Sequence, residues 1–468
     1  MKEVIFREYD IRGVVGTEFI IEEAYLLGKA IGSYFKQIHP EHSTIIVGKD
    51  GRTHSPLITQ HLIEAFIDLG YDVIDIGLVP TPVLYFAVHH LALPTALIVT
   101  ASHNPKEYNG IKIWGAWGEK IQVIKKIYEQ KNFYCNGTGK RGLVSTYAMV
   151  PVYIDYLADH FDHLKNRSLQ AVIDCGNGAA GVVLPALIEK MNWRDVTLLF
   201  SEVDGQFSNH EADPTVLENM LVVRDELVNN ALCEVGIGFD GDADRMNPMT
   251  KAGILVPGDK LLALYAQKVL ERFPGASIVF DIKSSSSLIE LLEQWHAKPV
   301  ISPSGHSLIK VVMNRHKALL GGELSCHFFF HDVYFGYDDG IYAALRLFEI
   351  LVETGKTLDE LLTIFPHKES SPEIRMKCDS DEEKVKIVEY VKNIFACRQD
   401  TQLLTIDGMR VQMPYGWGLI RASNTQPVIS LRFESTTKEG LLQVKKDFYT
   451  SLLPFFPAQT LNASINKE

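Results

Sequence analysis

Residues 96–105 read Ala96-Leu97-Ile98-Val99-Thr100-Ala101-Ser102-His103-Asn104-Pro105. The first four are apolar and too few for a helix, so they predict a β-strand, and the polar residues after them predict a turn. Ligands of open α/β sheets bind at the carboxyl ends of the strands, so this turn presents the Ser102 hydroxyl for chemistry. The same residue types also form ordinary turns, and these ten residues alone leave that alternative open.

Three other short apolar runs end in Asp and are followed by polar residues and a helical pattern. They are residues 45–50, 171–174 and 278–281. Each has a second predicted strand downstream, at residues 73–76, 196–200 and 300–301, and helical patterns such as 57–69 and 183–191 lie between the members of a pair. A strand, a helix and a strand at this spacing predict a βαβ unit with parallel pairing.

A third predicted strand completes each unit, at residues 96–99, 235–239 and 319–320. These strands open into three different polar loops, which contain Ser102, the segment 240–245 and the segment 321–327. Equivalent strand ends that carry different polar loops are expected where similar domains each contribute one edge to a shared cleft.

Turn-rich stretches at residues 136–142, 252–258 and 366–372 divide the chain. After the last of them, residues 428–434 alternate like a strand and 440–453 have a helical pattern. The predicted fold class is therefore α/β, with three similar mixed α/β/α domains followed by a smaller α+β domain around a central cleft. The expected boundaries are 1–150, 151–255, 256–368 and 369–468.

The composition of the 468-residue chain excludes several classes of protein. Its formal net charge of −12 argues against general nucleic-acid binding, which needs a basic surface. Charged residues near the N-terminus do not suit a signal peptide, and no apolar stretch is long enough to span a membrane. The six cysteines include no Cys-x-x-Cys pair, which is typical of a reduced protein. We expect a cytoplasmic protein with no nucleic-acid or membrane partner.

The loop after residue 239 predicts a metal site. Asp240, Asp242 and Asp244 alternate with small residues, so three carboxylates can converge on one hard divalent cation. An EF-hand loop begins in the same way, but Arg245 and Lys251 stand where it needs Gly and Glu. The alternative is a solvated acidic turn, which the repulsion among three close carboxylates disfavours.

Two other polar turns are less specific. Residues 421–427 combine a guanidinium, two hydroxyls and an amide between two apparent strands, and this composition suits either an anion cradle or a polar hairpin turn. Gly176, Gly178 and Gly181 have the spacing of a dinucleotide fingerprint. However, no acidic residue ends the next strand, so a tight strand-to-helix turn is the better interpretation.

Seven motifs, in order and across nearly the whole chain, resemble those of the α-D-phosphohexomutases, most closely the bacterial phosphomannomutase/phosphoglucomutase branch. They are Phe6 to Gly13, the Ser102 loop, Asn109 to Lys112, Asp240 to Arg245, Gly305 to Ser307, Gly322 to His327 and Arg421 to Pro427. The resemblance implies a phosphohexomutase, an isomerase that interconverts hexose 1-phosphate and hexose 6-phosphate of mannose or glucose. The implied intermediate and activator is a hexose 1,6-bisphosphate.

The resemblance also implies roles for individual residues. Ser102 matches the phosphoserine, and Asp240, Asp242 and Asp244 match the ligands of one Mg²⁺ per subunit, to which the phosphoserine adds an oxygen. Glu323 and Ser325 match contacts to sugar hydroxyls. The remaining matches are a clamp on the distal phosphate, made by Arg421, Ser423, Asn424 and Thr425, and further active-site positions at Tyr9, Arg12, Lys112, Arg245, Lys283, His306 and His327. The implied partners are sugar phosphates, and the implied state is a monomer or a small homo-oligomer.

The general acid or base is left open among these matches. Histidine is the usual proton shuttle near neutral pH, which favours His306 or His327. Lys112 or Arg12 could share the task in a strongly charged site. His103 is adjacent to Ser102, but neighbouring side chains on an extended backbone point apart. We therefore expect His103 to shape the loop or to contact phosphate.

The chain departs from the family pattern in the sugar loop, where Leu324 and Cys326 stand in place of the usual Met and Gly. The first change nearly conserves volume, whereas the second adds a side chain that narrows the choice of backbone conformations. Residues 207–214 also lack prolines that the family often has, which predicts a local loop change. The alternative functions are a phosphoglucosamine mutase, a metal-dependent phosphatase and a non-catalytic sugar-phosphate sensor.

Overall fold

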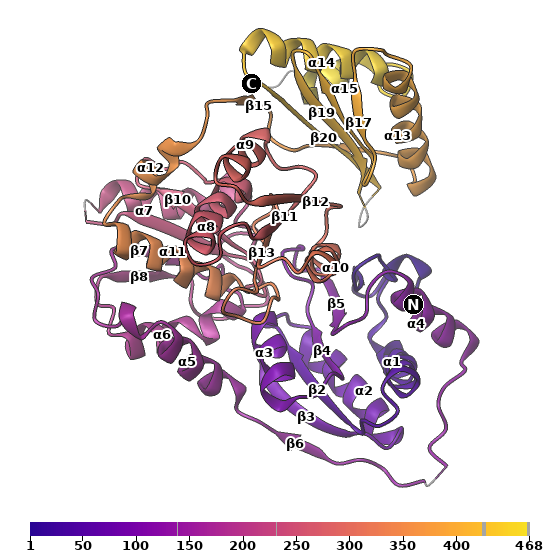
Figure 1. Cartoon of the computed structure of the whole chain (residues 1–468). Helices are drawn as coiled ribbons and strands as arrows, with labels where there is room; N and C mark the ends of the chain where they lie inside the picture. The colour runs from indigo at the N-terminus through magenta and orange to yellow at the C-terminus, as the bar shows by residue number, and fades with distance from the viewer. Residues whose placement is uncertain (138, 231, 424–426, 466–468) are drawn as a thin grey trace. The chain divides into compact units, whose positions relative to one another are not determined.

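The computed structural model describes residues 1–137, 139–230, 232–423 and 427–465 (Figure 1). The chain divides into two compact units. The first contains Met1–Arg272 and Leu319–Leu362, and the second contains Phe273–Ala318 and Thr363–Glu468. This division is coarser than the four predicted domains, whose boundaries stay a prediction. Among the described residues, no helix combines the length and the apolar character needed to cross a membrane.

The first sheet of the first unit has six strands in the order β1-β5-β4-β2-β3-β6. They are β1 (Ile11–Val14), β2 (Thr44–Lys49), β3 (Asp72–Leu78), β4 (Ala96–Val99), β5 (Tyr108–Ile113) and β6 (Val144–Thr146). Strand β2 pairs in parallel with β3 and with β4, as the βαβ pattern predicts. The helices of this part are α1 (Ala24–Ile38), α2 (Ser55–Asp68), α3 (Thr81–Leu91) and α4 (Glu119–Gln130).

Alternate residues of these strands face one hydrophobic core. Ile45 and Val47 of β2 and Leu97 and Val99 of β4 belong to a single buried cluster with side chains of α1, α2 and α4. Successive side chains of a strand point to opposite faces, so an apolar run of this kind is buried on both sides when helices cover the sheet. The short run at residues 96–99 is fully buried for this reason.

The second sheet has four strands in the order β10-β9-β7-β8. They are β7 (Ala171–Asp174), β8 (Val196–Leu199), β9 (Val235–Phe239) and β10 (Met246–Thr250), with the helices α5 (Met149–His160), α6 (Leu184–Met191) and α7 (Leu221–Asn229). Strand β7 pairs in parallel with β8 and β9. Gly176 and Asn177 have positive φ angles in the turn after β7, which confirms the tight turn predicted there.

The remaining elements of the first unit are α8 (Gly258–Arg272), β13 (Leu320–Gly322), β14 (Phe328–Phe330), α11 (Gly340–Thr354) and α12 (Leu358–Leu361). Strands β5, β10 and β14 each run antiparallel to the strand that precedes them in the chain. The sequence patterns did not reveal these return strands, because β5 contains Asn109 and Gly110, β10 contains Pro248 and β14 is only three residues long. Each of the three polar loops therefore joins a predicted strand to an antiparallel neighbour.

Asp339 holds a buried group of aromatic residues at the start of α11. Its carboxylate caps the helix by accepting from the Tyr342 amide at 2.8 Å, and it also accepts from the hydroxyls of Tyr153 and Tyr334, each at 2.8 Å. Burial raises the pKa of Asp339 to about 6, although these donors oppose the rise. One carboxylate thus satisfies three donors, two of them nearby in the chain and the third from α5.

Asp339→Ala is expected to destabilise the first unit by roughly 3–5 kcal/mol, because it removes a helix cap and leaves two buried phenols without their acceptor. Thermal unfolding followed by circular dichroism measures the effect. Asp162→Ala is the control, since Asp162 is exposed. The melting temperature of this variant should match that of the unsubstituted protein. Equal melting temperatures for the two variants would contradict this account of Asp339.

The second unit contains β11 (Ser277–Asp281), α9 (Ser286–Gln294), β12 (Lys298–Ser302) and α10 (His306–His316), with β11 and β12 paired in parallel as predicted. Its C-terminal part has six strands, β15 (Glu369–Ser370), β16 (Ile374–Lys377), β17 (Gln402–Leu404), β18 (Met409–Met413), β19 (Gly416–Ala422) and β20 (Val428–Ser435). The helices are α13 (Asp381–Ala396), α14 (Lys438–Leu452) and α15 (Ala458–Ile465). These strands pair antiparallel, which confirms the smaller α+β part.

Candidate active site

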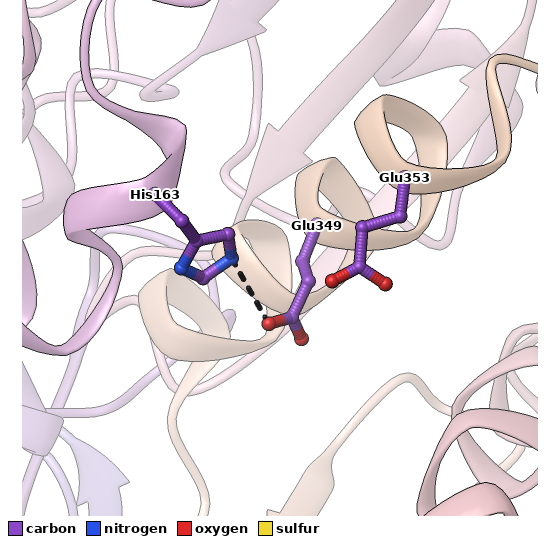
Figure 2. Close-up of side chains that lie close together, drawn as sticks. All are labelled: His163, Glu349 and Glu353. Carbon is purple, nitrogen blue, oxygen red and sulfur yellow. Dashed lines mark ion pairs between the residues drawn. The ribbon is translucent and has the colours of Figure 1, made fainter.

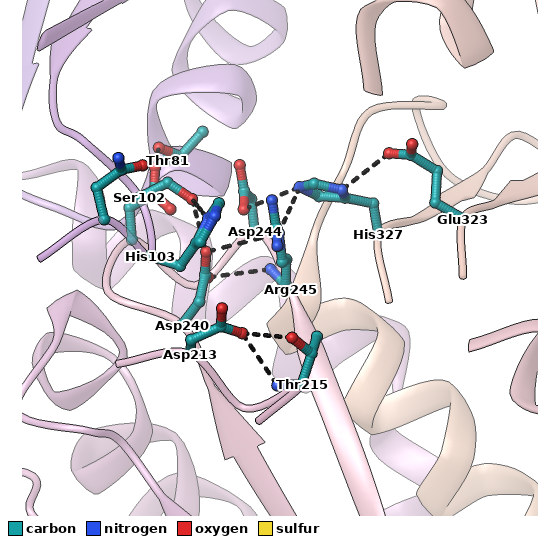
Figure 3. Close-up of polar contacts among 12 residues, drawn as sticks. Thr81, Ser102, His103, Asp213, Thr215, Asp240, Asp244, Arg245, Glu323 and His327 are labelled. Atoms are coloured by element: carbon teal, nitrogen blue, oxygen red, sulfur yellow. Dashed lines mark hydrogen bonds and ion pairs between the residues drawn. The ribbon is translucent and has the colours of Figure 1, made fainter. Parts of the chain in front are cut away.

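Ser102 lies in the connection between β4 and β5, and its side chain is buried (Figure 3). Its hydroxyl donates to Asp240 Oδ2 at 2.7 Å, and its amide donates to Thr100 Oγ1 at 3.0 Å. The φ angle of Ser102 is +51°, in the left-handed region that a residue with a Cβ rarely adopts. Such a conformation persists only where the surrounding structure enforces it, and it is common at functional sites.

This left-handed backbone corrects one premise of the sequence analysis. The expectation that His103 points away from Ser102 assumed an extended backbone, but His103 Nδ1 lies 3.3 Å from Ser102 Oγ. Burial, together with the charges of Arg245 and Arg12, holds the pKa of His103 well below its usual range. His103 is therefore a neutral ring beside the hydroxyl, and its predicted contact with phosphate stays a prediction.

The three aspartates lie in the connection between β9 and β10. Asp240, Asp242 and Asp244 are completely buried, and an oxygen from each lies within 4.8 Å of the others. The loop comes close to the Ser102 loop, since a Cβ added to Gly241 would lie 2.6 Å from the Ser102 carbonyl oxygen. The absence of a side chain at Gly241 thus allows the two backbones to approach each other.

Donors from three elements surround Asp242. Its Oδ2 atom accepts from Thr81 at 2.6 Å, from Thr100 at 3.2 Å and from Lys112 Nζ at 2.7 Å, and Lys112 also bonds to Asp244. Its Oδ1 atom is buried and has no hydrogen-bond partner in the described part of the chain. A buried carboxylate oxygen of this kind calls for a ligand. The group could hold a metal, and its all-oxygen donor set suits a hard divalent cation such as Mg²⁺.

The charges inside this group influence one another strongly. Burial and the neighbouring carboxylates raise the pKa of Asp240 well above its usual range. Burial would also raise the pKa of Asp244, but Lys112, His327 and Arg245 outweigh it and lower that pKa well below its usual range. The pKa of Lys112 rises despite burial, because Asp242 and Asp244 stabilise its charge. Positive charge is thus needed to hold three buried carboxylates together.

His327 connects the loop of the three aspartates to the loop between β13 and β14. Its Nδ1 atom lies 2.9 Å from Glu323 Oε2, and its Nε2 atom lies 3.3 Å from Asp244 Oδ1 and 3.1 Å from Arg245 Nε (Figure 3). Burial and Arg245 lower the pKa of His327, but Asp244 and Glu323 raise it more, to about 9. A protonated ring donates to both carboxylates, whereas a neutral ring can accept from Arg245. His327 can therefore hold or release a proton in this region.

The N-terminal strand supplies another cation. Arg12 of β1 donates to the Asn104 side chain at 2.6 Å and to the Ala101 carbonyl at 3.2 Å, and it also pairs with Asp10. Tyr9 precedes this strand and is half-buried, as is Ser325 in the loop between β13 and β14. The first unit thus brings together most of the predicted site residues, namely Arg12, Ser102, His103, Lys112, the three aspartates, Arg245, Glu323 and His327.

The departure at Cys326 has a structural counterpart. Cys326 is buried and has a φ angle of +66°, a conformation that costs a non-glycine residue about 1 kcal/mol or more. Its thiol contacts Asn247 of β10, and its amide donates to the Glu323 carbonyl at 3.0 Å. The loop therefore keeps a backbone conformation that suits glycine while it carries a side chain.

The other predicted site residues belong to the second unit. Lys283 lies 3.2 Å from Glu373 and 3.5 Å from Asp281, and Arg421 Nε donates to Asp407 at 2.9 Å. Ser423 follows β19, where its carbonyl accepts from Lys384, and His306 begins α10. Arg421 is the penultimate residue of β19, which ends at Ala422, and β20 begins at Val428. Asn424 and Thr425 lie outside the described residues.

Sequence reasoning missed Arg52, Thr81, Asn104 and Asp213. Thr81 bonds to Asp242, Asn104 accepts from Arg12, and Asp213 helps to raise the pKa of Arg245 against its burial. Figure 3 shows Asp213 accepting from the amide and the hydroxyl of Thr215. One signal was available for Arg52, because it follows the predicted strand 45–50 at the same edge of the sheet as Ser102.

A second group with the ligand types of a metal site lies on the surface (Figure 2). It contains His163, Glu349 and Glu353. His163 Nε2 is 3.1 Å from Glu349, but Glu349 also pairs with Arg346 at 3.1 Å and Glu353 pairs with Lys268 at 2.5 Å. Both carboxylates thus have cationic partners, and the group is an exposed ion-pair network.

Four family models match the chain in succession. They are the phosphoglucomutase/phosphomannomutase alpha/beta/alpha domains I, II and III, at residues 3–134, 151–253 and 257–368, and the phosphoglucomutase/phosphomannomutase C-terminal domain, at residues 373–451. The fold is also that of a solved phosphoglucomutase/phosphomannomutase family protein from Burkholderia thailandensis. That structure has a TM-score of 0.87 and 34% identity, and the match covers 97% of this chain and 98% of that one.

Two curated relatives have the name phosphomannomutase/phosphoglucomutase. The one from Pseudomonas syringae pv. tomato is 43% identical over 98% of this chain and 97% of its own length, and the one from Pseudomonas aeruginosa is 41% identical over 96% and 95%. The chain belongs to the phosphoglucomutase/phosphomannomutase family, within the α-D-phosphohexomutases. It is an enzyme of the isomerase class, a phosphotransferase that acts within one substrate molecule.

Proposed function

We propose that this enzyme interconverts the 1-phosphates and 6-phosphates of glucose and mannose, with Ser102 as the residue that carries the phosphoryl group. The observation that carries the proposal is the buried hydroxyl of Ser102, 2.7 Å from Asp240 and next to a cluster of three carboxylates. A hydroxyl with only a structural role does not need a carboxylate cluster beside it. A phosphoserine does, because its negative charge has to be neutralised by a bound cation.

The proposed metal is one Mg²⁺ per subunit, held by Asp240, Asp242 and Asp244 with an oxygen of the phosphorylated Ser102. When bound, it would supply electrostatic stabilisation of the charge on the transferring phosphoryl group. Two features support this assignment, namely the all-oxygen donor set and the Oδ1 atom of Asp242, which has no hydrogen-bond partner among the described residues. Lys112 and Arg245 add fixed positive charge at the same place.

The transfer is balanced in two steps. In the first, the bond between phosphorus and Ser102 Oγ breaks, a bond between phosphorus and a sugar hydroxyl oxygen forms, the hydroxyl proton goes to a base, and Ser102 takes up a proton. The product is a hexose 1,6-bisphosphate. In the second, after the bisphosphate has turned around, the bond between its other phosphorus and the sugar oxygen breaks and a bond from that phosphorus to Ser102 Oγ forms. Ser102 gives up its proton, and the sugar oxygen takes up one. The same compound serves as the activator that phosphorylates an unmodified Ser102.

We assign the proton transfer to a residue of the group Arg12, Lys112, His306 and His327. His327 is supported by its contacts with Asp244 and Glu323, which hold a proton on the ring. Glu323 and Ser325 are proposed to bind sugar hydroxyls, and Tyr9, His103, Arg245 and Lys283 to contact the substrate. The distal phosphate is assigned to Arg421, Ser423, Asn424 and Thr425. These last assignments rest on the family resemblance.

The remaining parts of the proposal concern partners and location. Sugar phosphates are the proposed partners, and the proposed state is a monomer or a small homo-oligomer. A cytoplasmic location is supported by the cysteines, because all six lie in the described part of the chain and are free thiols.

A coupled assay tests the function directly. Purified protein with Mg²⁺ and a trace of glucose 1,6-bisphosphate is expected to convert both glucose 1-phosphate and mannose 1-phosphate into the 6-phosphates, without release of inorganic phosphate. Inorganic phosphate as the main product would instead indicate a phosphatase. Binding without turnover would indicate a sensor, and turnover of glucosamine phosphate alone would indicate the glucosamine branch, which the names of the relatives do not favour.

A further inference from the structure

Arg52 lies in the turn between β2 and α2, and only 1% of its surface is exposed. Its guanidinium donates four hydrogen bonds, and all four go to backbone carbonyls of the segment that carries Ser102. Nη2 donates to the carbonyls of Ser102 at 2.8 Å and Asn104 at 2.5 Å. Nη1 donates to those of Pro105 at 2.8 Å and Tyr108 at 3.1 Å.

The guanidinium is itself held in place from two sides. Its Nε atom lies 3.2 Å from Asp50 Oδ2, and the other oxygen of Asp50 accepts from the Arg52 amide and from Ser55. The ring of Phe207 lies 5.0 Å from the guanidinium carbon. A guanidinium group is planar, rigid and always charged, and it has five hydrogen-bond donors. When the guanidinium of Arg52 is held in place, it therefore holds the carbonyls that it contacts in place as well. Lysine cannot reproduce this geometry.

The segment held in this way contains the unusual backbone of Ser102. A left-handed φ at a serine is disfavoured unless its surroundings enforce it. Arg52 bonds to the carbonyl of Ser102 itself and to three carbonyls that follow it, which hold the turn between β4 and β5 closed. The side chain of Ser102 then faces Asp240.

We propose that Arg52 is a positioning residue for phosphoryl transfer, which holds the Ser102 loop so that Oγ faces the carboxylate cluster throughout the reaction. This inference rests on the proposed function, and it adds a residue that would not touch the substrate. Because rates depend steeply on the placement of the reacting atom, a small shift of this loop would cost about 100-fold in rate. Substrate binding, which uses other residues, would change little.

The test compares Arg52→Met and Arg52→Lys with Arg346→Met. Arg346 is a matched control, because it is also a buried arginine of the first unit but pairs with Asp332 and Glu349. For Arg52→Met we expect kcat to fall about 100-fold while KM stays within about threefold, and phosphorylation of Ser102 by glucose 1,6-bisphosphate to slow to the same extent. The kcat of Arg52→Lys should lie between that of Arg52→Met and that of the unsubstituted protein. Arg346→Met should lower the melting temperature and keep kcat within about twofold.

A kcat for Arg52→Met close to that of the unsubstituted protein would overturn the proposal, as would a loss of activity that only follows the fraction of folded protein. If Arg52→Met does not fold, Arg52→Lys decides in the same way, since an unchanged kcat in that variant would also overturn it. An inactive unsubstituted protein would refute the proposed function. An active one together with an active Arg52→Met protein would refute only the role of Arg52.

Discussion

Ser102→Ala is expected to abolish the mutase reaction, with a loss in kcat of about 1,000-fold or more, and to eliminate the phosphorylated form of the protein. In the proposed reaction Ser102 supplies the oxygen that carries the phosphoryl group in both steps, so no other residue can substitute for it. The coupled assay with glucose 1-phosphate measures the first effect. Intact-mass analysis after incubation with glucose 1,6-bisphosphate measures the second.

Ser168→Ala is the matched control, because Ser168 is exposed and its hydroxyl donates to Asp195. The Ser168→Ala protein should retain full activity and should still be phosphorylated by glucose 1,6-bisphosphate. The role of Ser102 would be refuted by a Ser102→Ala protein that still gains the mass of a phosphate and turns over at the normal rate. Loss of activity with an unchanged melting temperature would show that the effect is chemical.

Removal of divalent metal should reduce turnover to background, and added Mg²⁺ should restore it. In addition, Asp240→Asn is expected to lower kcat about 100-fold and to raise the Mg²⁺ concentration needed for half-maximal activity, because it removes one carboxylate from the proposed ligand set and alters the acceptor of the Ser102 hydroxyl. Titration of Mg²⁺ into the chelated enzyme, with activity and bound metal both measured, tests this prediction.

The surface group offers a control for the metal titration. Glu349→Gln changes the surface cluster that has metal-binding residue types, and it should leave the Mg²⁺ requirement of the enzyme unchanged. A chelated enzyme with full activity would contradict the metal assignment. So would a Glu349→Gln protein whose Mg²⁺ requirement shifts as much as that of Asp240→Asn.

Much of the fold was predictable because its main strands have a recognisable local sequence pattern. The runs at residues 45–50, 96–99, 171–174 and 235–239 all appear as strands within one or two residues of their predicted bounds. A strand that consists of an apolar run of four to six residues between turn residues can be recognised from its neighbours in the sequence alone. The return strands β5 and β10 lack this signal, since Gly110 and Pro248 are acceptable only where an adjacent strand allows them.

The candidate site was predictable as a set of residues and less so as a geometry. The family resemblance named several side chains that lie near one another in the first unit, and the alternation of Asp240, Asp242 and Asp244 indicated convergent carboxylates. The prediction that the His103 side chain points away from Ser102 rested on a wrong premise, an extended backbone. A left-handed conformation cannot be recognised from a serine in a polar turn. Arg52 was missed because all the carbonyls that it binds lie far away along the chain.

The sequence by itself determined the α/β class, the order of the polar loops and the chemical groups that they carry. These properties depend on short-range patterns of apolar, small and acidic residues. Only the tertiary structure decided that Lys112 pairs with Asp242, 130 residues away, and that Arg52 closes the Ser102 loop. The reason is physical, since sheet pairing brings strand ends together and so decides which buried charges must compensate one another.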